Sequence, residues 1–395
     1  MPSSTSSSDG LRDLAERDAR AGMPDRDARQ TAADRPGVAQ PVPVRPVPAQ
    51  PWGRILLGTV LLLVLLVAGW EEYWRAYGVR PSIANTFGLW SMQRRRIDAG
   101  EGAATVLLGD SRLYFDIHLP VWERLDGRRP IQLSFEGTAP LPVLEDLAAD
   151  PKFTGRLLIG VAPDVFFSGF KFRGAAVGYA RKESPSQRIG QWLSMHFIEP
   201  YFAFDDPDYA LQTVLARQPW PVRVHQRLPV RKLAMTESDR NTYLWSKLET
   251  DPEYRTIIRN TWLNHMQRWD DEPPPAAALK NEKEQIERTA HAVAKLRARG
   301  VKVLFVRMPS DGAYLEFENR KYPRARTWDA LLAASGVPGI YFADYPELQG
   351  YELPEWSHIK HSDAERFTGE LYKVIQRDFW GPNAPGVSAK ASAAR

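Results

Sequence analysis

A serine and a histidine from distant parts of the sequence have neighbours suited to nucleophilic catalysis. Ser111 ends a Gly-Asp-Ser tripeptide that directly follows the apolar run Val106–Leu108. His358 lies three residues after Glu355, near the other end of the chain. A serine hydroxyl becomes a good nucleophile when an imidazole accepts its proton and a carboxylate orients that imidazole. The residue types therefore predict acyl-transfer chemistry, provided that folding brings the two segments together.

The apolar run before Ser111 is typical of a buried strand whose carboxyl end carries a ligand site. Further apolar runs alternate with segments of helical period, which indicates a parallel sheet covered by helices on both faces. The predicted strands are Val106–Leu108, Ile131–Phe135, Leu157–Val161, Val301–Val306 and Gly339–Ala343. The predicted helices are Leu119–Leu125, Pro142–Ala149, Ala277–Arg299, Ala325–Ala334 and Ser362–Arg377.

The Gly-Asp-Ser tripeptide after the first strand, together with an acidic residue three positions before a C-terminal histidine, resembles the SGNH/GDSL hydrolase superfamily. The resemblance covers roughly residues 100–175 and 300–378. It implies a flavodoxin-like α/β fold with helices on both faces of a parallel sheet. It also implies that Ser111 is the nucleophile, His358 the general base and Glu355 the orienting acid. Most members carry Asp at the last position, and Glu serves in this role in related triads.

The same resemblance implies an oxyanion hole made by the nucleophile's N–H, a glycine after the second strand and an asparagine after the third. Ser111 and Gly137 fill the first two places. The third strand is followed by Asp164 without the expected asparagine, and a carboxyl group donates a hydrogen bond only when it is protonated. Arg112 and Arg307 are the other candidate donors. Both are predicted to bind a polar or anionic group of the substrate, and a structural ion pair is the alternative for Arg307.

Composition argues against several other classes of function. The chain has 395 residues, with 52 Lys and Arg against 48 Asp and Glu, and the net charge of +4 is too small to suggest nucleic-acid binding. It contains no cysteine, so disulfides and thiolate metal sites are excluded. His361 lies three residues after His358, but no further cluster completes a metal site. No metal and no cofactor is predicted.

The uncharged segment Ile55–Trp70 would form about 24 Å of helix, slightly short of a membrane span, and Trp52 and Trp70 at its ends suit the membrane interface. A buried core helix and a cleaved signal peptide are the weighed alternatives. We predict a disordered tail over 1–52, a transmembrane signal anchor over 53–72, an α/β domain over 73–380 and a second tail over 381–395. Counting cations on either side does not decide the orientation.

Residues 169–275 interrupt the predicted strand–helix alternation and are rich in aromatic residues and arginine. We predict a helical insertion that caps the strand ends, with helices at Tyr243–Leu248 and Thr256–Trp269. Four tryptophans are expected mainly to fill the core of this cap, namely Trp192, Trp245, Trp262 and Trp269.

A single N-terminal membrane helix before such a domain is similar to the membrane-anchored branch that includes DltD and the alginate O-acetylation proteins. This resemblance implies a serine acyl esterase or O-acyltransferase that acts on a cell-envelope polysaccharide, beside a membrane-bound O-acyltransferase partner. It places the N-terminus in the cytoplasm and the catalytic domain in the periplasm, anchored in the inner membrane. The alternative is a catalytically inactive glycan-binding or accessory subunit of such an acyltransferase system.

Overall fold

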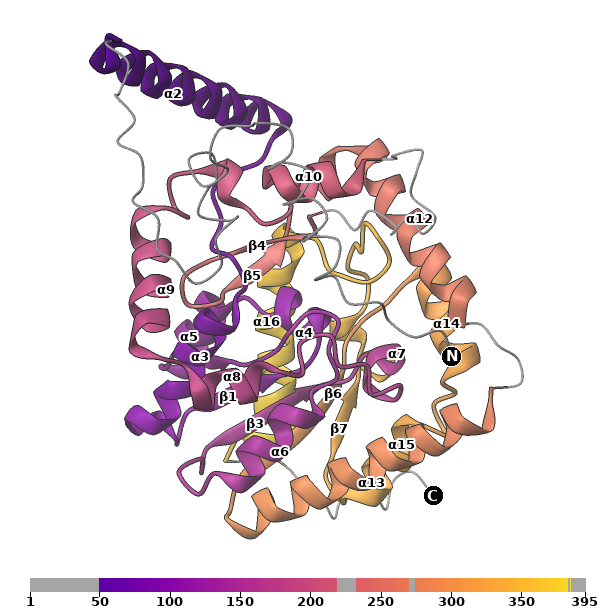
Figure 1. Ribbon diagram of the computed structural model, residues 1–395. Coiled ribbons are helices and arrows are strands. Elements are labelled where there is room, and N and C mark those ends of the chain that lie inside the picture. Colours follow the sequence, from indigo (N-terminus) through magenta and orange to yellow (C-terminus); the bar gives the residue numbers. More distant parts are fainter. Residues whose placement is uncertain (1–49, 219–231, 270–273, 383, 385–395) are drawn as a thin grey trace, which may run out of the picture. The chain divides into compact units, whose positions relative to one another are not determined.

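The computed structural model describes residues 50–218, 232–269, 274–382 and 384 (Figure 1). Most of the two predicted terminal tails lies outside these residues. Residues 1–64 and 65–395 form separate compact units, and each is described by itself. The second unit contains the sheet and all of the predicted site.

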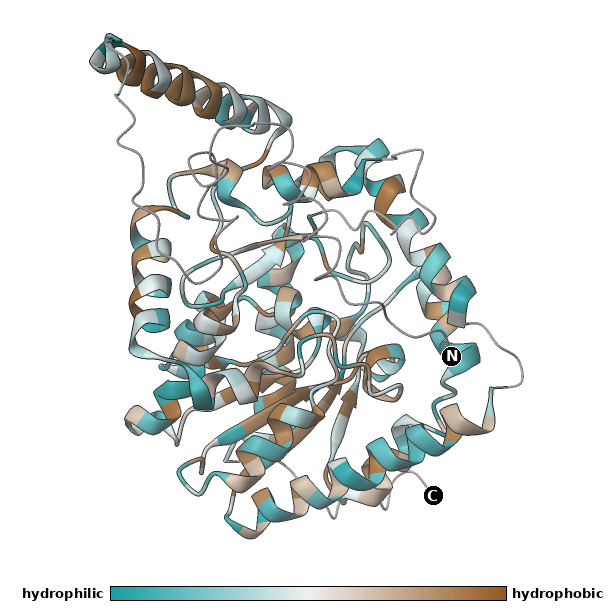
Figure 2. Ribbon diagram, in the orientation of Figure 1, coloured by the Kyte–Doolittle hydropathy of each residue, from teal (hydrophilic) through white to brown (hydrophobic). Residues whose placement is uncertain are grey.

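Helix α2 (Trp52–Tyr77) is long and apolar enough to cross a membrane, and the middle turns of its ribbon are brown in the hydropathy view (Figure 2). The helix continues several residues beyond the predicted end at residue 72. Trp74, near its C-terminal end, is buried and packs against Tyr209 with ring centroids 4.5 Å apart. The last turns of α2 therefore belong to the folded domain. Their aromatic packing explains why the helix is longer than predicted.

Five parallel strands form the central sheet, in the order β2-β1-β3-β6-β7. Each of the five predicted strands is confirmed, with ends that differ by up to three residues. The strands are β1 (Thr105–Leu108), β2 (Ile131–Gln132), β3 (Arg156–Gly160), β6 (Lys302–Arg307) and β7 (Gly339–Tyr341).

Helices cover both faces of this sheet, because alternate side chains of each strand enter two different cores. Val106 and Leu108 of β1 pack into one core, and Leu107 between them packs into the other. The first core is covered by α3 (Phe87–Arg96), α6 (Leu141–Ala149), α13 (Ala276–Ala298) and α15 (Trp328–Ser335). The second is covered by α4 (Ser111–Asp116), α5 (Leu119–Asp126) and α16 (His361–Ile375).

The strand order changes direction between β1 and β3. The chain leaves β1 toward one edge of the sheet and leaves β3 toward the other, and ligands of open α/β sheets bind outside such a switch point. Three helices begin at or just beyond this edge, namely α4 after β1, α7 (Pro163–Phe166) after β3 and α14 (Gly312–Lys321) after β6.

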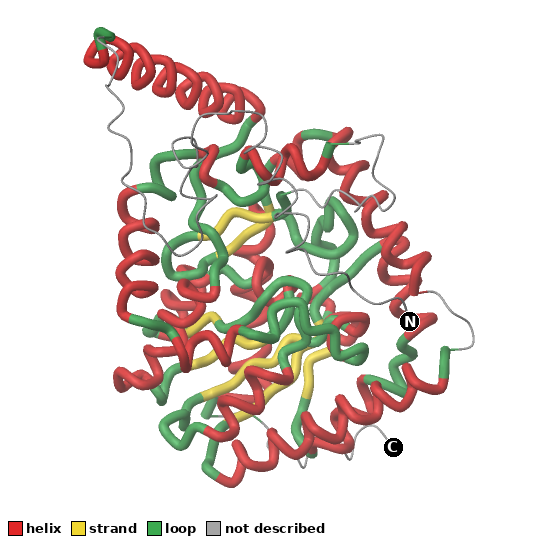
Figure 3. The backbone as a smooth tube through the Cα atoms, in the orientation of Figure 1, coloured by secondary structure: helices red, strands yellow, loops and turns green. Residues whose placement is uncertain are grey.

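The predicted insertion contains helices and a separate two-stranded hairpin (Figure 3). The predicted helix over Tyr243–Leu248 is wrong, because Thr242–Leu244 pairs antiparallel with Ala234–Thr236. Arg240 turns the chain with a φ of 68°, and the hydroxyl of Thr242 donates to that of Thr236. The elements are α8 (Ala176–Lys182), α9 (Pro185–Phe197), α10 (Leu211–Arg217), β4 (Ala234–Thr236), β5 (Thr242–Leu244), α11 (Lys247–Thr250) and α12 (Pro252–Trp269).

Candidate active site

The structure brings Ser111, His358 and Glu355 together in one hydrogen-bonded chain. Ser111 Oγ lies 2.9 Å from His358 Nε2, and His358 Nδ1 lies 2.8 Å from Glu355 Oε1. The same carboxylate oxygen accepts the backbone N–H of His358 at 2.7 Å. His358 and Glu355 are buried, whereas Ser111 is partly exposed. The predicted contacts among the three side chains are therefore present, and the nucleophile candidate is partly exposed.

Asp110 fixes the turn that presents Ser111. One of its carboxylate oxygens accepts the N–H of Arg112 at 2.8 Å and caps α4. The other accepts the N–H of Ala162, just after β3, also at 2.8 Å. These bonds tie the first turn of α4 to the end of the neighbouring strand, so Asp110 supports the turn.

Gly109 allows α4 to pack closely against the ends of β1 and β3. A Cβ atom at this position would lie 3.0 Å from the Cβ of Leu113 and 3.1 Å from the Cα of Gly160. A larger residue would push α4 outward, and Ser111 is the first residue of that helix. The glycine of the tripeptide is thus explained by packing.

The segment carrying His358 is held by contacts on both of its sides. Trp356 adopts a φ of 72°, a region that bulky residues rarely occupy, and its carbonyl accepts the N–H of Asp311 at 2.9 Å. A Cβ atom at Gly312 would lie 2.7 Å from the Trp356 indole. Ile359, directly after the histidine, donates its N–H to Asp116 of α4 at 3.0 Å. The strained backbone at Trp356 thus lies in the segment that positions the His358 imidazole.

Trp262 of α12 is a site residue that the sequence did not reveal. Its indole N–H donates to Glu355 Oε2, the carboxylate oxygen that does not contact His358. Burial alone would raise the pKa of Glu355, but His358 and the Trp262 hydrogen bond outweigh it and leave that pKa below its ordinary value. The carboxylate is therefore ionised at neutral pH, as an orienting acid must be.

The other predicted core tryptophans differ in position. Trp245 is buried in the insertion's core, as predicted, but Trp192 is 48% exposed, which contradicts the prediction. The side chain of Trp269 lies outside the described part of the chain. A short aromatic-rich segment does not reveal which of its rings face inward.

Two backbone N–H groups at this edge match the first two predicted oxyanion-hole positions. Neither Ser111 N nor Gly137 N has a hydrogen-bond acceptor among the described residues. Phe135 N donates to Gly109 O at 3.1 Å, which extends the pairing of β1 and β2 toward both groups. Gly137 has a φ of 55°, a left-handed conformation that favours glycine.

Asp164 occupies the third predicted position as a buried carboxyl group. It accepts the Tyr314 hydroxyl through Oδ2 at 2.6 Å, and Oδ1 has no hydrogen-bond partner within the described ranges. Burial raises the pKa of Asp164, and repulsion from Glu318 acts in the same direction. A protonated Asp164 carboxyl group could donate a hydrogen bond, as a group at the third oxyanion-hole position must.

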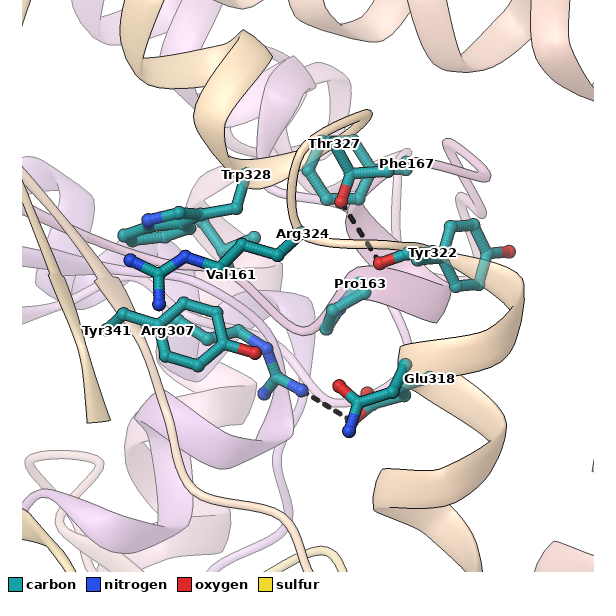
Figure 4. Close-up of a pocket in the computed structure, with 11 residues that line it drawn as sticks. Val161, Pro163, Phe167, Arg307, Glu318, Tyr322, Arg324, Thr327, Trp328 and Tyr341 are labelled. Carbon is teal, nitrogen blue, oxygen red and sulfur yellow. Dashed lines mark hydrogen bonds and ion pairs between the residues drawn. The ribbon is translucent and has the colours of Figure 1, made fainter. Parts of the chain in front are cut away.

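Arg112 and Arg307 form buried ion pairs with Glu318 of α14, at 2.8 and 2.6 Å. Figure 4 shows the pair between Arg307 and Glu318. Arg112 also donates to Ser357 Oγ at 3.2 Å, and Arg307 donates to the Met308 carbonyl at 2.6 Å. The structural ion pair weighed for Arg307 is thus present, and Arg112 shares it. The small cavity in Figure 4 adjoins Arg307 and does not include Ser111.

His361 does not join His358 in a metal site. Its ring stacks on Tyr243 with centroids 4.0 Å apart and faces His118 at 5.8 Å. Within the described ranges, no group of three or more His, Asp or Glu side chains is placed to hold a metal ion.

Two exposed aromatic rings flank Gly137. Phe170 and Phe172 are 49% and 67% exposed, and both rings come within 4.0 Å of the position that a Cβ at Gly137 would take. Their loop is fixed by the bond from Ala139 N to Phe170 O and by a bridge between Thr138 and Lys171.

Comparison with known proteins does not identify a family: no family model matches the sequence, and no curated protein matches it significantly. The functional argument therefore depends on the site itself.

Proposed function

We propose that this protein is a membrane-anchored, SGNH-like serine acyl esterase or O-acyltransferase that acts on a cell-envelope polysaccharide. The observation that carries the proposal is the Ser111–His358–Glu355 hydrogen-bond chain at the carboxyl edge of the sheet. The strand order supports it, since β2-β1-β3-β6-β7 corresponds to the flavodoxin-like order.

In the first half of the reaction, Ser111 Oγ attacks the acyl carbonyl carbon while His358 Nε2 takes the hydroxyl proton. The oxyanion that forms is stabilised by the N–H groups of Ser111 and Gly137. The bond to the leaving alcohol then breaks, His358 returns the proton to that oxygen, and an acyl-serine remains. Glu355 holds the imidazole in the required tautomer and stabilises the imidazolium.

In the second half, water or a sugar hydroxyl attacks the acyl-serine and gives its proton to His358 Nε2. The bond between the acyl carbon and Ser111 Oγ then breaks, and His358 returns the proton to Oγ. Water as the acceptor releases a free acid, and a sugar hydroxyl yields a new ester. Both outcomes share one intermediate, so one site serves as esterase or transferase.

The exposed rings of Phe170 and Phe172 support a saccharide substrate. Aromatic side chains offer flat apolar faces, and the C–H face of a pyranose ring is a suitable partner. These rings adjoin Gly137, so a sugar stacked on them would lie beside the proposed oxyanion hole.

We further propose that α2 anchors the protein in the inner membrane with the N-terminus in the cytoplasm and the catalytic domain in the periplasm. A membrane-bound O-acyltransferase is the proposed partner, because an extracytoplasmic transferase needs a donor that delivers acyl groups across the membrane.

The test is mass spectrometry of the purified full-length protein after incubation with an activated aryl acetate. We expect one acetyl group on the Ser111 peptide. The Ser111→Ala variant should carry none, with aryl ester turnover reduced roughly 10³-fold or more. Ser168→Ala, in a partly buried serine outside the triad, is the control and should retain both signals.

An accessory role without catalysis is the second candidate, favoured by the lack of an asparagine after β3. It predicts that wild-type protein forms no acyl adduct and that cells carrying Ser111→Ala keep full polymer acylation. Either result, at unchanged protein level, would contradict the enzymatic proposal.

A further inference from the structure

Helix α9 and the turn after it expose a continuous row of apolar side chains. On the helix these residues recur at the three- and four-residue spacing of a single face. Seven residues, here named the α9 patch, make up the row: Ile189, Trp192, Leu193, Phe197, Ile198, Tyr201 and Phe202, each between 40% and 61% exposed. Exposed apolar groups gathered in this way mark an interaction surface.

The opposite face of α9 is already packed, so the patch is an outward surface of a fixed element. Met195 is buried in a cluster with Ile83 and Leu89 of the segment around α3. Gln191 accepts a hydrogen bond from the hydroxyl of Thr86, and Ser184 and Gln187 form a capping box at the start of the helix.

The turn after α9 is bonded directly to the end of α2. Glu71 accepts the N–H groups of Ala203 and Phe204, both at 2.9 Å, and Arg75 donates to the Tyr201 carbonyl at 2.8 Å. Glu71 directly follows the uncharged segment of the helix. At 1.5 Å per residue, both bonded side chains lie within about 8 Å of the end of that segment along the helix axis.

This attachment places the turn after α9 beside the residues of α2 that directly follow the apolar segment. The polar residues that follow an apolar span lie at the headgroup level, where Tyr and Trp are enriched. Tyr73 of the same helix turns is 60% exposed, and Tyr201 of the α9 patch, whose carbonyl accepts a hydrogen bond from Arg75, is 61% exposed.

We propose that the α9 patch is a membrane-contact surface whose side chains lie in the headgroup–acyl boundary of the lipid bilayer in which α2 is anchored. Apolar side chains on one face of a helix partition into this layer and hold a domain against the surface. The inference depends on α2 crossing the membrane and is independent of the chemistry at Ser111.

The test uses the full-length protein in phosphatidylethanolamine and phosphatidylglycerol vesicles. Because the chain has no cysteine, a single introduced cysteine carries a unique nitroxide label. Ile198→Cys and Phe202→Cys report the patch, at wild-type exposures of 43% and 40%. Leu125→Cys and Leu279→Cys are matched controls, at 44% and 39%.

We expect the ratio of oxygen to nickel-chelate accessibility to be several-fold higher at the patch labels than at the control labels. A Leu61→Cys label within the apolar segment verifies insertion in the same vesicles. Thermal unfolding midpoints verify that each labelled protein is folded.

If Leu61→Cys reports lipid while the patch labels equal the controls, the anchor stands and the proposed contact surface is refuted. Patch labels that match the controls in pure lipid, and become protected only in native membrane vesicles, would show that a protein covers the patch and would also overturn the proposal. The Ser111→Ala background separates this result from the proposed function, since label depths should not change in it.

Discussion

Glu355 accepts hydrogen bonds through both oxygens of its carboxylate. Oε1 accepts two donors from His358, the ring N–H and the backbone N–H, and Oε2 accepts the indole N–H of Trp262. Trp262, from a helix of the insertion, therefore holds the carboxylate that contacts the His358 ring. We regard it as a positioning residue that acts through Glu355 and His358.

Replacing Trp262 with Phe should lower kcat for an aryl ester about tenfold or more while KM changes little. The ring volume is largely kept, and a hydrogen bond to a charged group is worth about 1.5–3 kcal/mol. Trp245→Phe, which changes a buried indole elsewhere in the insertion, is the control and should keep kcat. Steady-state kinetics of both variants, with thermal midpoints as a check on folding, decide the matter. Unchanged kcat in a folded Trp262→Phe protein would show that this contact has no positioning role.

The sequence indicated Ser111, His358 and Glu355 because nucleophile, base and acid have recognisable types and local spacing. It did not indicate Trp262, because that residue lies 93 positions from the carboxylate it contacts. Asp116 was likewise invisible, since its partner Ile359 is 243 positions away. Residues that act through tertiary contacts carry no local signal of type or spacing.

Glu318, a buried carboxylate of helix α14, links two elements near the site. Glu318 pairs with Arg112 of α4 and Arg307 of β6, and all three side chains are buried. Burial alone would raise the pKa of Glu318, but the two guanidinium groups outweigh it and lower that pKa. Breaking such an arrangement leaves buried charges without partners, which is more costly than losing the ion pairs themselves.

Glu318→Gln should lower the free energy of unfolding by about 3–5 kcal/mol at neutral pH. Because the folded-state pKa is lowered, the stabilisation is present above the unfolded value of about 4.3 and is lost as the pH falls further. The difference between wild type and variant should therefore be full near pH 7 and shrink below about pH 4. Urea unfolding at several pH values measures it.

The control for this experiment is Glu123→Gln, which removes an exposed partner of Arg129 and should change stability little. Equal effects of the two substitutions would contradict the role assigned to Glu318.

Element boundaries followed from the sequence where apolar periodicity was strong, as in the five strands and in α13 and α16. Helix α14 was missed because two of its inward-facing residues, Glu318 and Lys321, are charged and hide the helical period. The segment at Tyr243 was misassigned because a short apolar run fits a strand as well as a helix.

At the scale of the whole molecule, α2 and the α/β domain share the residues that end the apolar segment. Trp74 is both the last buried residue of α2 and part of the insertion's core. The sequence indicated an apolar span and a parallel sheet, but it gave no sign that the insertion packs on the end of the span. That contact depends on aromatic residues far apart in the chain, such as Trp74 and Tyr209.

A reporter phosphatase that is active only outside the cytoplasm, fused after Arg395, should be active in cells. The chain should also resist extraction from membranes by alkaline carbonate, because an apolar helix that spans the bilayer is not released by high pH. A variant with two charged residues placed mid-segment, Leu62→Lys and Leu65→Lys, should lose both properties. A reporter active only in the cytoplasm would contradict the proposed orientation.

The distance of 247 positions between Ser111 and His358 has a consequence for biogenesis. If the protein is the exported acyl-transfer enzyme proposed above, Ser111 is synthesised long before His358, and an incomplete chain holds an unactivated alcohol that cannot consume acyl donors in the cytosol. Reactivity would switch on only after the final helix has closed onto the sheet. A chain that terminates before His358 would then lack the general base and remain unreactive.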